Sequence, residues 1–175
     1  MTAWNSPPPP PGNPYRHWLT HSGSLTQRIV ERCPNFWVVR AHQGPQQPAP
    51  NEAGLIGIRS KQMVLVRDVY LYCGDTPLVF AHSVVQLRDL KGAWHSLDKL
   101  GTKPLAAALF SDPRVKRFPL AFAAIDRRHP LYQRACAALG AAPRRLWARR
   151  SLFKLHGRPI LVTEVFLPTI LELQC

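Results

Sequence analysis

Two charged residues, Arg67 and Glu164, lie in segments whose other residues are mostly apolar, and their side chains could together bind or transform an anion. Residues 63–71 read MVLVRDVYL and residues 160–167 read ILVTEVFL. Both segments are rich in branched and aromatic residues, as β-strands are. Because side chains alternate between the two faces of a strand, each charged residue shares its face with apolar neighbours. An arginine in such a place can hold a carboxylate by two hydrogen bonds, and a glutamate can accept one from a hydroxyl or transfer a proton.

The burial of Arg67 and Glu164 requires compensation, because a charge among apolar side chains costs several kcal/mol unless a partner is near. If both strands belong to one sheet, the two side chains could compensate each other as a structural salt bridge. Alternatively, a polar anionic ligand could be held between them. The residue pattern is consistent with both interpretations.

Each of the two charged strands is expected to belong to a β-hairpin, because turn-forming residues adjoin both. Gly-Asp-Thr-Pro follows the first strand and His-Gly-Arg-Pro precedes the second. The predicted hairpins pair residues 62–72 with 78–85 and residues 151–155 with 160–167. A short strand is also predicted over residues 36–39, and the segment 42–51, rich in Pro, Gln and Gly, is expected to be a mobile loop.

Three helices are predicted outside the hairpins. The apolar spacing over residues 25–33, after a serine that can cap the N-terminus, predicts the first, which the following proline ends. The second begins at Thr102 with Pro104 in its first turn, so that Leu105 offers an unpaired backbone N–H to an anion. The third covers residues 130–139 and ends at a glycine. Hairpins flanking helices describe an α+β fold, with a single domain, an antiparallel β-sheet and helices packed on one face.

The length of 175 residues fits one domain with a sizeable core. Near the N-terminus, the run Pro7–Pro11 cannot enter a helix or a central strand. We therefore predict a disordered tail over residues 1–14 and a folded domain over 15–175. No stretch approaches the roughly 20 apolar residues that span a bilayer, and the N-terminus lacks the pattern of a secretory signal. A cytoplasmic location is expected.

The four cysteines, at positions 33, 73, 136 and 175, do not have the spacing of a metal site. A disulfide framework is not expected in a chain of this size that lacks an export signal. We interpret three of them as small core or surface residues and Cys175 as a thiol at the terminus.

The charge of the chain is strongly basic, with 23 Lys and Arg against 10 Asp and Glu and a net charge of +13. Such a surplus favours a polyanion, an anionic membrane surface or a small anionic substrate as partner. The basic residues gather at 114–117, 127–128 and 144–150, and we interpret these clusters as solvated surface. A nucleic-acid-binding protein is the chief alternative, although the sequence has no helix-turn-helix, zinc knuckle or RNA-binding signature.

Four segments resemble the chorismate pyruvate-lyase family, the 4-hydroxybenzoate synthases of bacterial ubiquinone biosynthesis. They are Leu-Val-Arg-Asp-Val at 65–69, Lys-Leu-Gly-Thr-Lys-Pro-Leu at 99–105, Arg-Arg-Ser at 149–151, and Gly-Arg-Pro-Ile-Leu-Val-Thr-Glu-Val-Phe-Leu-Pro at 157–168. The resemblance extends in order from about His17 to Pro168, and the last segment is its most specific part.

The resemblance implies an enzyme that cleaves chorismate to 4-hydroxybenzoate and pyruvate without a metal or an organic cofactor, and we expect a monomer. By position, Arg67 corresponds to the carboxylate-binding arginine of the family and Glu164 to its hydroxyl-contacting glutamate, which makes them the catalytic candidates. Leu25 and Leu105 correspond to the two residues that contact the ligand through their backbones. The family also implies that mobile flaps, here around Leu25 and residues 97–105, bury the ligand.

A binding protein without activity is an alternative that the resemblance leaves open. Transcriptional regulators are related to the family by fold, and a sensor could hold an aromatic carboxylate without turning over chorismate. The sequence also departs from the family at His82, where arginine is common.

Overall fold

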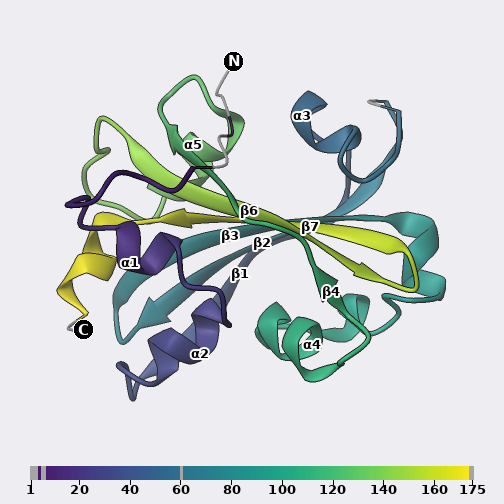
Figure 1. Cartoon of the computed structure of the whole chain (residues 1–175), viewed down its shortest axis with the longest axis horizontal. Helices are drawn as coiled ribbons and strands as arrows, with labels where there is room; N and C mark the ends of the chain where they lie inside the picture. Colours follow the sequence, from purple (N-terminus) through teal and green to yellow (C-terminus); the bar gives the residue numbers. More distant parts are fainter. Residues whose placement is uncertain (1–3, 5–6, 60, 174–175) are drawn as a thin grey trace.

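The computed structural model describes residue 4, residues 7–59 and residues 61–173. Within them the chain forms one α+β domain, built on a seven-stranded antiparallel sheet (Figure 1). The strands are β1 (Phe36–Gln46), β2 (Val64–Cys73), β3 (Thr76–Gln86), β4 (Lys116–Arg117), β5 (Ala121–Ile125), β6 (Leu146–Leu155) and β7 (Arg158–Phe166). Their order across the sheet is β1-β2-β3-β7-β6-β4, and β5 also pairs with β6. The predicted α+β class and antiparallel sheet are confirmed.

Helices cover both faces of the sheet, and not only one face as we expected. They are α1 (Arg16–Leu19), α2 (Leu25–Val30), α3 (Pro50–Ala53), α4 (Leu105–Ser111) and α5 (Pro130–Cys136), with the short 3₁₀ helices η1 (Leu87–Lys91), η2 (Leu97–Lys99) and η3 (Pro168–Glu172). In Figure 1, α1, α2 and α4 lie below the sheet and α3 and α5 lie above it. The central strands carry apolar residues on both faces, so both faces need a cover.

The face of the sheet that carries Arg67 has two apolar clusters. One joins Trp18 of α1 to Val69 of β2, and the other joins Leu109 of α4 to Leu65 of the same strand. Arg67 lies between Leu65 and Val69 on this face. The two clusters therefore leave a polar position between them, in the middle of an otherwise apolar surface.

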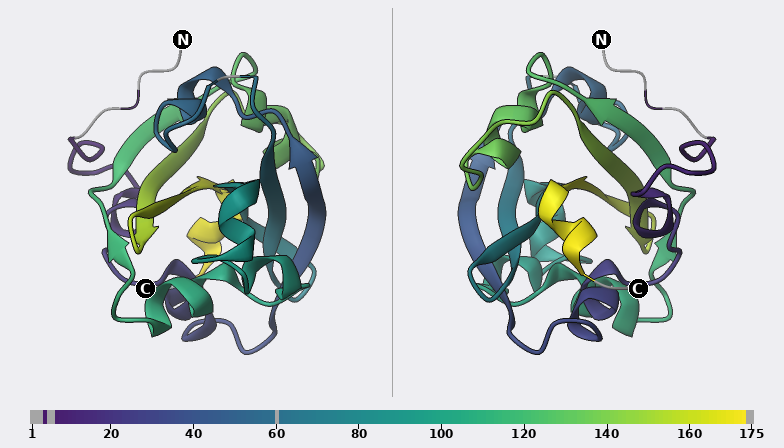
Figure 2. Two further views of the ribbon diagram at one scale, coloured as in Figure 1. Left: turned by 90° about the vertical axis from the view of Figure 1, so that its right-hand side faces the viewer. Right: turned by 90° about the vertical axis from the view of Figure 1, so that its left-hand side faces the viewer.

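Both predicted hairpins are present. β2 pairs with β3, β6 pairs with β7, and β3 pairs with β7 to join the two hairpins into one strongly twisted sheet (Figure 2). β6 begins at Leu146, five residues before the predicted start. The reason is that Leu146 and Ala148 are buried against α5 on the opposite face and extend the ladder to β5.

The prediction of a mobile loop over residues 42–51 is wrong, because most of these residues belong to a strand or a helix. β1 passes a register shift between Arg40 and His42 and continues along β2 until Gln46 pairs with Val64. Its proline is tolerated because β1 is an edge strand. α3 then follows at residues 50–53.

The three longer helices are shorter than predicted, although each is present. Ser24 caps α2 by accepting a hydrogen bond of 3.2 Å from the Gln27 amide, as expected, but the helix ends at Val30. α4 begins at Leu105 with Pro104 as its N-cap rather than at Thr102. Gly101 explains the later start of α4, because its φ of +56° places a left-handed turn just before Thr102. α5 ends at Cys136 instead of residue 139.

The interpretation of the cysteines needs one correction. Cys33 and Cys73 form a disulfide, with their Cα atoms 5.8 Å apart. Cys33 follows α2 and Cys73 ends β2, so the bond ties the segment that carries Leu25 to the strand that carries Arg67. The pairing could not be read from their sequence separation of 40 residues, because only the fold brings them together. Cys136 is free, and Cys175 lies outside the described residues.

The described part of the predicted tail contacts the domain. The Arg150 guanidinium lies 4.1 Å from the ring of Trp4, and Arg16 donates a hydrogen bond to the carbonyl of the buried Pro9. Residues 1–3, 5 and 6 of the tail lie outside the described residues, and the boundary at residue 14 stays a prediction. No helix within the described residues is long and apolar enough to cross a membrane.

Candidate active site

The four residues singled out in the sequence, Leu25, Arg67, Leu105 and Glu164, line one cavity. The cavity lies on the sheet face between the two apolar clusters, beneath α2 and α4. Its volume is about 50 Å³, which leaves room for a few water molecules. An apolar cavity that admits benzene measures about 150 Å³, so an aromatic ligand requires this one to open. The segments expected to act as flaps, around Leu25 and residues 97–105, contribute to the lining of the cavity through Leu25 and Leu105. Their mobility stays a prediction.

Strand pairing aligns the floor of the cavity. Arg67 on β2 stands opposite Ser83 on β3, Ser83 stands opposite Val162 on β7, and Val162 stands opposite Ser151 on β6. This row crosses four strands on one face, and Val162 is its one apolar residue. Glu164 lies on the same face, two residues beyond Val162.

Arg67 is a buried cation that has no carboxylate partner among the described residues. It is 4% exposed, and its Nη2 donates to the carbonyl oxygens of Gly101 (3.2 Å) and Lys103 (2.9 Å). Its Nε has no partner, and no acidic residue in the described part of the chain lies within ion-pair distance. Burial, followed by the charge of Arg40, lowers the pKa of Arg67. Of the two interpretations that the sequence left open, the salt bridge between Arg67 and Glu164 is therefore not found, because Glu164 pairs with another arginine.

That partner is Arg149, which sequence reasoning did not assign to the site. Its Nε donates to Glu164 Oε2 over 2.5 Å, and the two residues stand opposite each other on β6 and β7. Arg149 is 1% exposed, and its Nη1 donates to the carbonyl oxygens of Trp18, Leu19 and His21. These bonds fix the carboxylate of Glu164 on the cavity wall.

Arg117 and Ser151 are two further cavity residues that sequence reasoning missed. Arg117 Nε donates to Ser151 Oγ over 2.9 Å, and its Nη1 donates to Ser22 O over 2.5 Å. Alternation along residues 146–155 was the available signal. It puts Arg149, Ser151 and an aromatic residue on one face, whereas we interpreted the arginines as solvated surface.

Leu25 and Leu105 are the first residues of the two helices over the cavity. Leu25 is 2% exposed and packs in the cluster beneath α2, and Leu105 packs on the cluster beneath α4. The carbonyl groups that Arg67 contacts, of Gly101 and Lys103, belong to the segment just before α4. The side chain of Arg67 therefore connects the sheet to this cover, in addition to the apolar cluster beneath α4.

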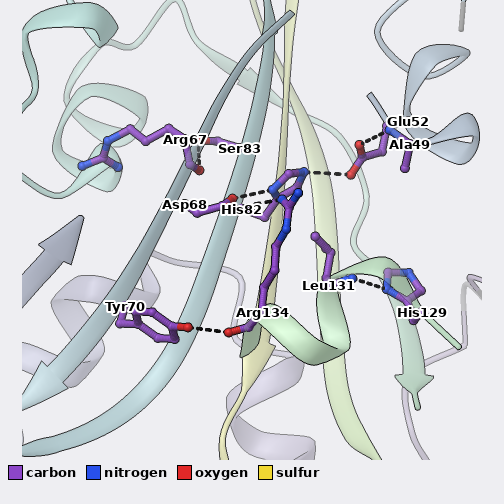
Figure 3. A network of polar contacts seen from close by, with 10 residues as sticks. All are labelled: Ala49, Glu52, Arg67, Asp68, Tyr70, His82, Ser83, His129, Leu131 and Arg134. Atoms are coloured by element: carbon purple, nitrogen blue, oxygen red, sulfur yellow. Dashed lines mark hydrogen bonds and ion pairs between the residues drawn. The ribbon is translucent and has the colours of Figure 1, made fainter. Parts of the chain in front are cut away.

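His82 does not reach the cavity, because it points to the opposite face of the sheet (Figure 3). Its Nδ1 lies 2.6 Å from Asp68 and its Nε2 lies 3.0 Å from Glu52. Asp68 also pairs with Arg134 of α5 over 3.0 Å, and Glu52 accepts from the Ala49 amide at the start of α3. This group of ion pairs, His82, Asp68, Glu52 and Arg134, joins both helices of that face to the sheet.

Comparison with known proteins gives one consistent result. The model of the chorismate lyase family matches residues 9–174. A protein of Nitrosospira multiformis named "Probable chorismate pyruvate-lyase" is 50% identical over 174 residues, which cover 99% of this chain and 97% of that protein. A protein of Aromatoleum aromaticum with the same name is 52% identical and covers 98% and 95%, respectively.

Two solved structures of low sequence identity share this fold. PhnF from Mycobacterium smegmatis superposes with a TM-score of 0.58 over 85% of this chain and 65% of its own, at 14% identity. The C-terminal domain of the histidine utilization repressor from Pseudomonas syringae has a TM-score of 0.56 over 77% of this chain and 92% of its own, at 13% identity. At such low identity, the similarity concerns the fold alone.

Proposed function

The chain belongs to the chorismate lyase family, and from that premise we propose that it converts chorismate to 4-hydroxybenzoate and pyruvate in the cavity lined by Arg67 and Glu164. The two related proteins match this chain over 97% and 95% of their own length. The proposal includes the assignment of Leu25, Arg67, Leu105 and Glu164 as the residues that bind the substrate.

The proposed reaction rearranges the atoms of chorismate without adding any. The bond between the ring and the enolpyruvyl ether oxygen breaks, and a hydrogen leaves the neighbouring ring carbon, which carries the hydroxyl. One hydrogen joins the enolpyruvyl methylene, which gives pyruvate, and the ring becomes the aromatic ring of 4-hydroxybenzoate. Since aromatisation makes the reaction strongly downhill, orientation and charge complementarity are the main tasks of the protein.

The observation that carries the proposal is the buried guanidinium of Arg67, which faces a cavity and has no acidic partner in the part of the chain that the structure describes. A cation in this state is stabilised when an anion arrives, and a guanidinium binds a carboxylate with two parallel hydrogen bonds. We assign the ring carboxylate of chorismate to Arg67. Leu105, at the start of α4, completes this end of the site through its backbone.

Glu164 receives the ring hydroxyl in this proposal. The hydroxyl lies opposite the carboxylate on the ring, and Glu164 lies on the same sheet face as Arg67, two strands away, or roughly 10 Å between backbones. Arg149 holds the Glu164 carboxylate in place, so that this carboxylate can accept a hydrogen bond from the ring hydroxyl. Transfer of the ring hydrogen follows one of two routes, through Glu164 or directly to the enolpyruvyl methylene.

The direct test is to add chorismate to the pure protein and to follow 4-hydroxybenzoate by its absorbance and pyruvate by a coupled dehydrogenase. We expect the two products in equal amounts, and at least a tenfold loss of turnover in Arg67→Met. Chorismate that disappears at the uncatalysed rate would refute the proposal. Size-exclusion chromatography and cell fractionation test the further proposals of a monomer and a cytoplasmic location.

A sensor of aromatic carboxylates is the second candidate, because the fold is shared with the C-terminal domain of the histidine utilization repressor. Such a protein would bind 4-hydroxybenzoate with the same Arg67 contact and would leave chorismate unchanged. The product assay separates the two functions. Nucleic-acid binding is suggested by the net charge of +13. It predicts that the affinity for DNA falls steeply as the salt concentration rises, which a binding titration at several salt concentrations would test.

A further inference from the structure

Arg117 is the second cation at the cavity that is available to a ligand. Three of the described residues that line the cavity are cationic: Arg67, Arg117 and Arg149. Arg149 is occupied by Glu164 and by three carbonyl groups. Arg117 contacts no carboxylate within ion-pair distance among the described residues, and no described group accepts from its Nη2.

The guanidinium of Arg117 is held in a defined place. It lies 5.5 Å from the ring centre of Phe110 on α4 and 5.3 Å from that of Phe153 on β6. Ser151 Oγ accepts from its Nε, so the side chain is fixed by a hydrogen bond as well as by the two rings. A fixed and half-buried guanidinium with a free donor is suited to bind a carboxylate.

The position of Arg117 matches one end of the proposed substrate. Arg117 lies on β4, which pairs with β6, and its hydrogen bond to Ser151 places it two residues along β6 from Arg149, the partner of Glu164. Arg67 lies on β2, which β3 and β7 separate from β6. In chorismate, the ether oxygen is attached to the ring carbon next to the one that bears the hydroxyl. If Glu164 receives the hydroxyl, the enolpyruvyl carboxylate projects from the same end of the ring.

We propose that Arg117 binds the enolpyruvyl carboxylate of the substrate, while Arg67 binds the ring carboxylate. This inference rests on the proposed function and adds a subsite that distinguishes substrate from product. 4-Hydroxybenzoate keeps the ring carboxylate and the hydroxyl but has lost the second carboxylate. Arg117 therefore contributes to the affinity for the substrate and not to that for the aromatic product, and it binds pyruvate until that product leaves.

A pair of stable ligands tests the subsite without any turnover. 3-(Carboxymethoxy)-4-hydroxybenzoate carries a second carboxylate through an ether at the ring position where chorismate carries its enolpyruvyl group, and 4-hydroxybenzoate lacks it. Their dissociation constants would be measured by calorimetry for the wild type, Arg117→Gln, Arg117→Lys and Arg114→Gln. Arg114 is a matched control, because it lies three residues away, is exposed and pairs with Asp112 outside the cavity.

We expect Arg117→Gln to weaken the dicarboxylate about 10- to 100-fold and to change the affinity for 4-hydroxybenzoate less than threefold, as the loss of one charge-assisted contact predicts. Arg117→Lys, which keeps the charge but not the planar fork, should lose less. Arg114→Gln should resemble the wild type. If thermal unfolding shows that Arg117→Gln folds poorly, Arg117→Lys takes its place. The quantity compared with the wild type is then the dissociation constant of the dicarboxylate divided by that of 4-hydroxybenzoate, which should rise in the variant.

An equal loss for both ligands, or no loss for either, would overturn the subsite. The proposed function fails by a different result, namely the absence of turnover in the wild type. Its failure leaves the ligand comparison interpretable, because neither ligand reacts. If turnover is present, Arg117→Gln should lower kcat/KM for chorismate by the same 10- to 100-fold, while product inhibition by 4-hydroxybenzoate stays unchanged.

Discussion

Arg67 and Arg149 are both buried arginines of one cavity, yet replacing each with methionine should have different consequences for stability. Arg149→Met leaves the Glu164 carboxylate without a cation and three buried carbonyl groups without a donor. Removing one partner of a buried pair lowers the free energy of unfolding by about 3–5 kcal/mol. This variant is expected to be strongly destabilised.

Arg67→Met combines two opposing effects. The hydrogen bonds to Gly101 O and Lys103 O are lost, and each is worth about 0.5–1.5 kcal/mol. Removing a buried charge that has no acidic partner favours the folded state by about 1–4 kcal/mol when a well-packed apolar side chain takes its place. The two effects offset each other, so the free energy of unfolding should stay within about 2 kcal/mol of the wild-type value.

Urea unfolding without 4-hydroxybenzoate measures the stability of each variant, and unfolding with it measures the stability gained by binding the ligand. At a ligand concentration of 100 times the dissociation constant, the wild type should gain about 2.7 kcal/mol of stability. Arg67→Met should lose most of this gain at the same concentration. Arg145→Met, a change at an exposed position, controls for the loss of one positive charge.

Two results would contradict the proposed role of Arg67. If Arg67→Met were as unstable as Arg149→Met, the main role of Arg67 would be to hold the segment before α4 on the sheet, and the buried charge would not be kept for a ligand. A variant that keeps its stability and also keeps the ligand-induced gain would place the carboxylate elsewhere.

Three other outcomes can be checked with the same protein. Burial lowers the pKa of His82, but its hydrogen bonds to Asp68 and Glu52 outweigh this effect and raise the pKa to about 9. Protonated His82 therefore stabilises the fold fully below about pH 6.5, and this contribution, about 3 kcal/mol, is lost as the pH rises through about 9. Urea unfolding at a series of pH values should show a flatter profile for His82→Gln, and identical profiles would contradict it. Reduction of the Cys33–Cys73 disulfide should lower the free energy of unfolding by about 2–4 kcal/mol, and an unchanged urea midpoint in reductant would show that the bond is absent in solution. Because helices cover the cavity, product release should limit turnover, so stopped-flow mixing with chorismate should give a burst of about one product per enzyme, whereas a linear onset would make chemistry the slow step.

The positions of Arg67 and Glu164 could be predicted from the sequence because strand periodicity is a local property. A charged residue among alternating apolar ones has a defined face, whatever the sheet looks like. Their partners could not be predicted in the same way. The Arg149–Glu164 pair depends on the register between β6 and β7, and the contacts of Arg67 depend on where residues 101–103 cross the sheet.

The same distinction explains the two main errors. The Cys33–Cys73 bond joins a helix end to a strand end that lie together only after the sheet has formed, and compartment rules carry no geometric information. The continuation of β1 through residues 42–46 depends on β2, which offers a partner strand to a polar segment with weak propensity of its own. In both cases, tertiary contacts outweighed the local signal.

Arg67 and Asp68 are neighbours in the sequence, and the alternation of β2 sends them to opposite faces of the sheet (Figure 3). Asp68 is fully compensated by His82 and Arg134, and its ion pairs attach α5 to the sheet. Arg67 has hydrogen bonds to carbonyl groups but no counter-charge within residues 7–59 and 61–173. The charge on one face is therefore paired within the protein, and the charge on the other is the one that we propose binds a ligand. Consequently, Asp68→Asn should lower stability with little effect on the affinity for 4-hydroxybenzoate, the reverse of Arg67→Met, and equal effects of both changes on both quantities would show that the two faces are coupled.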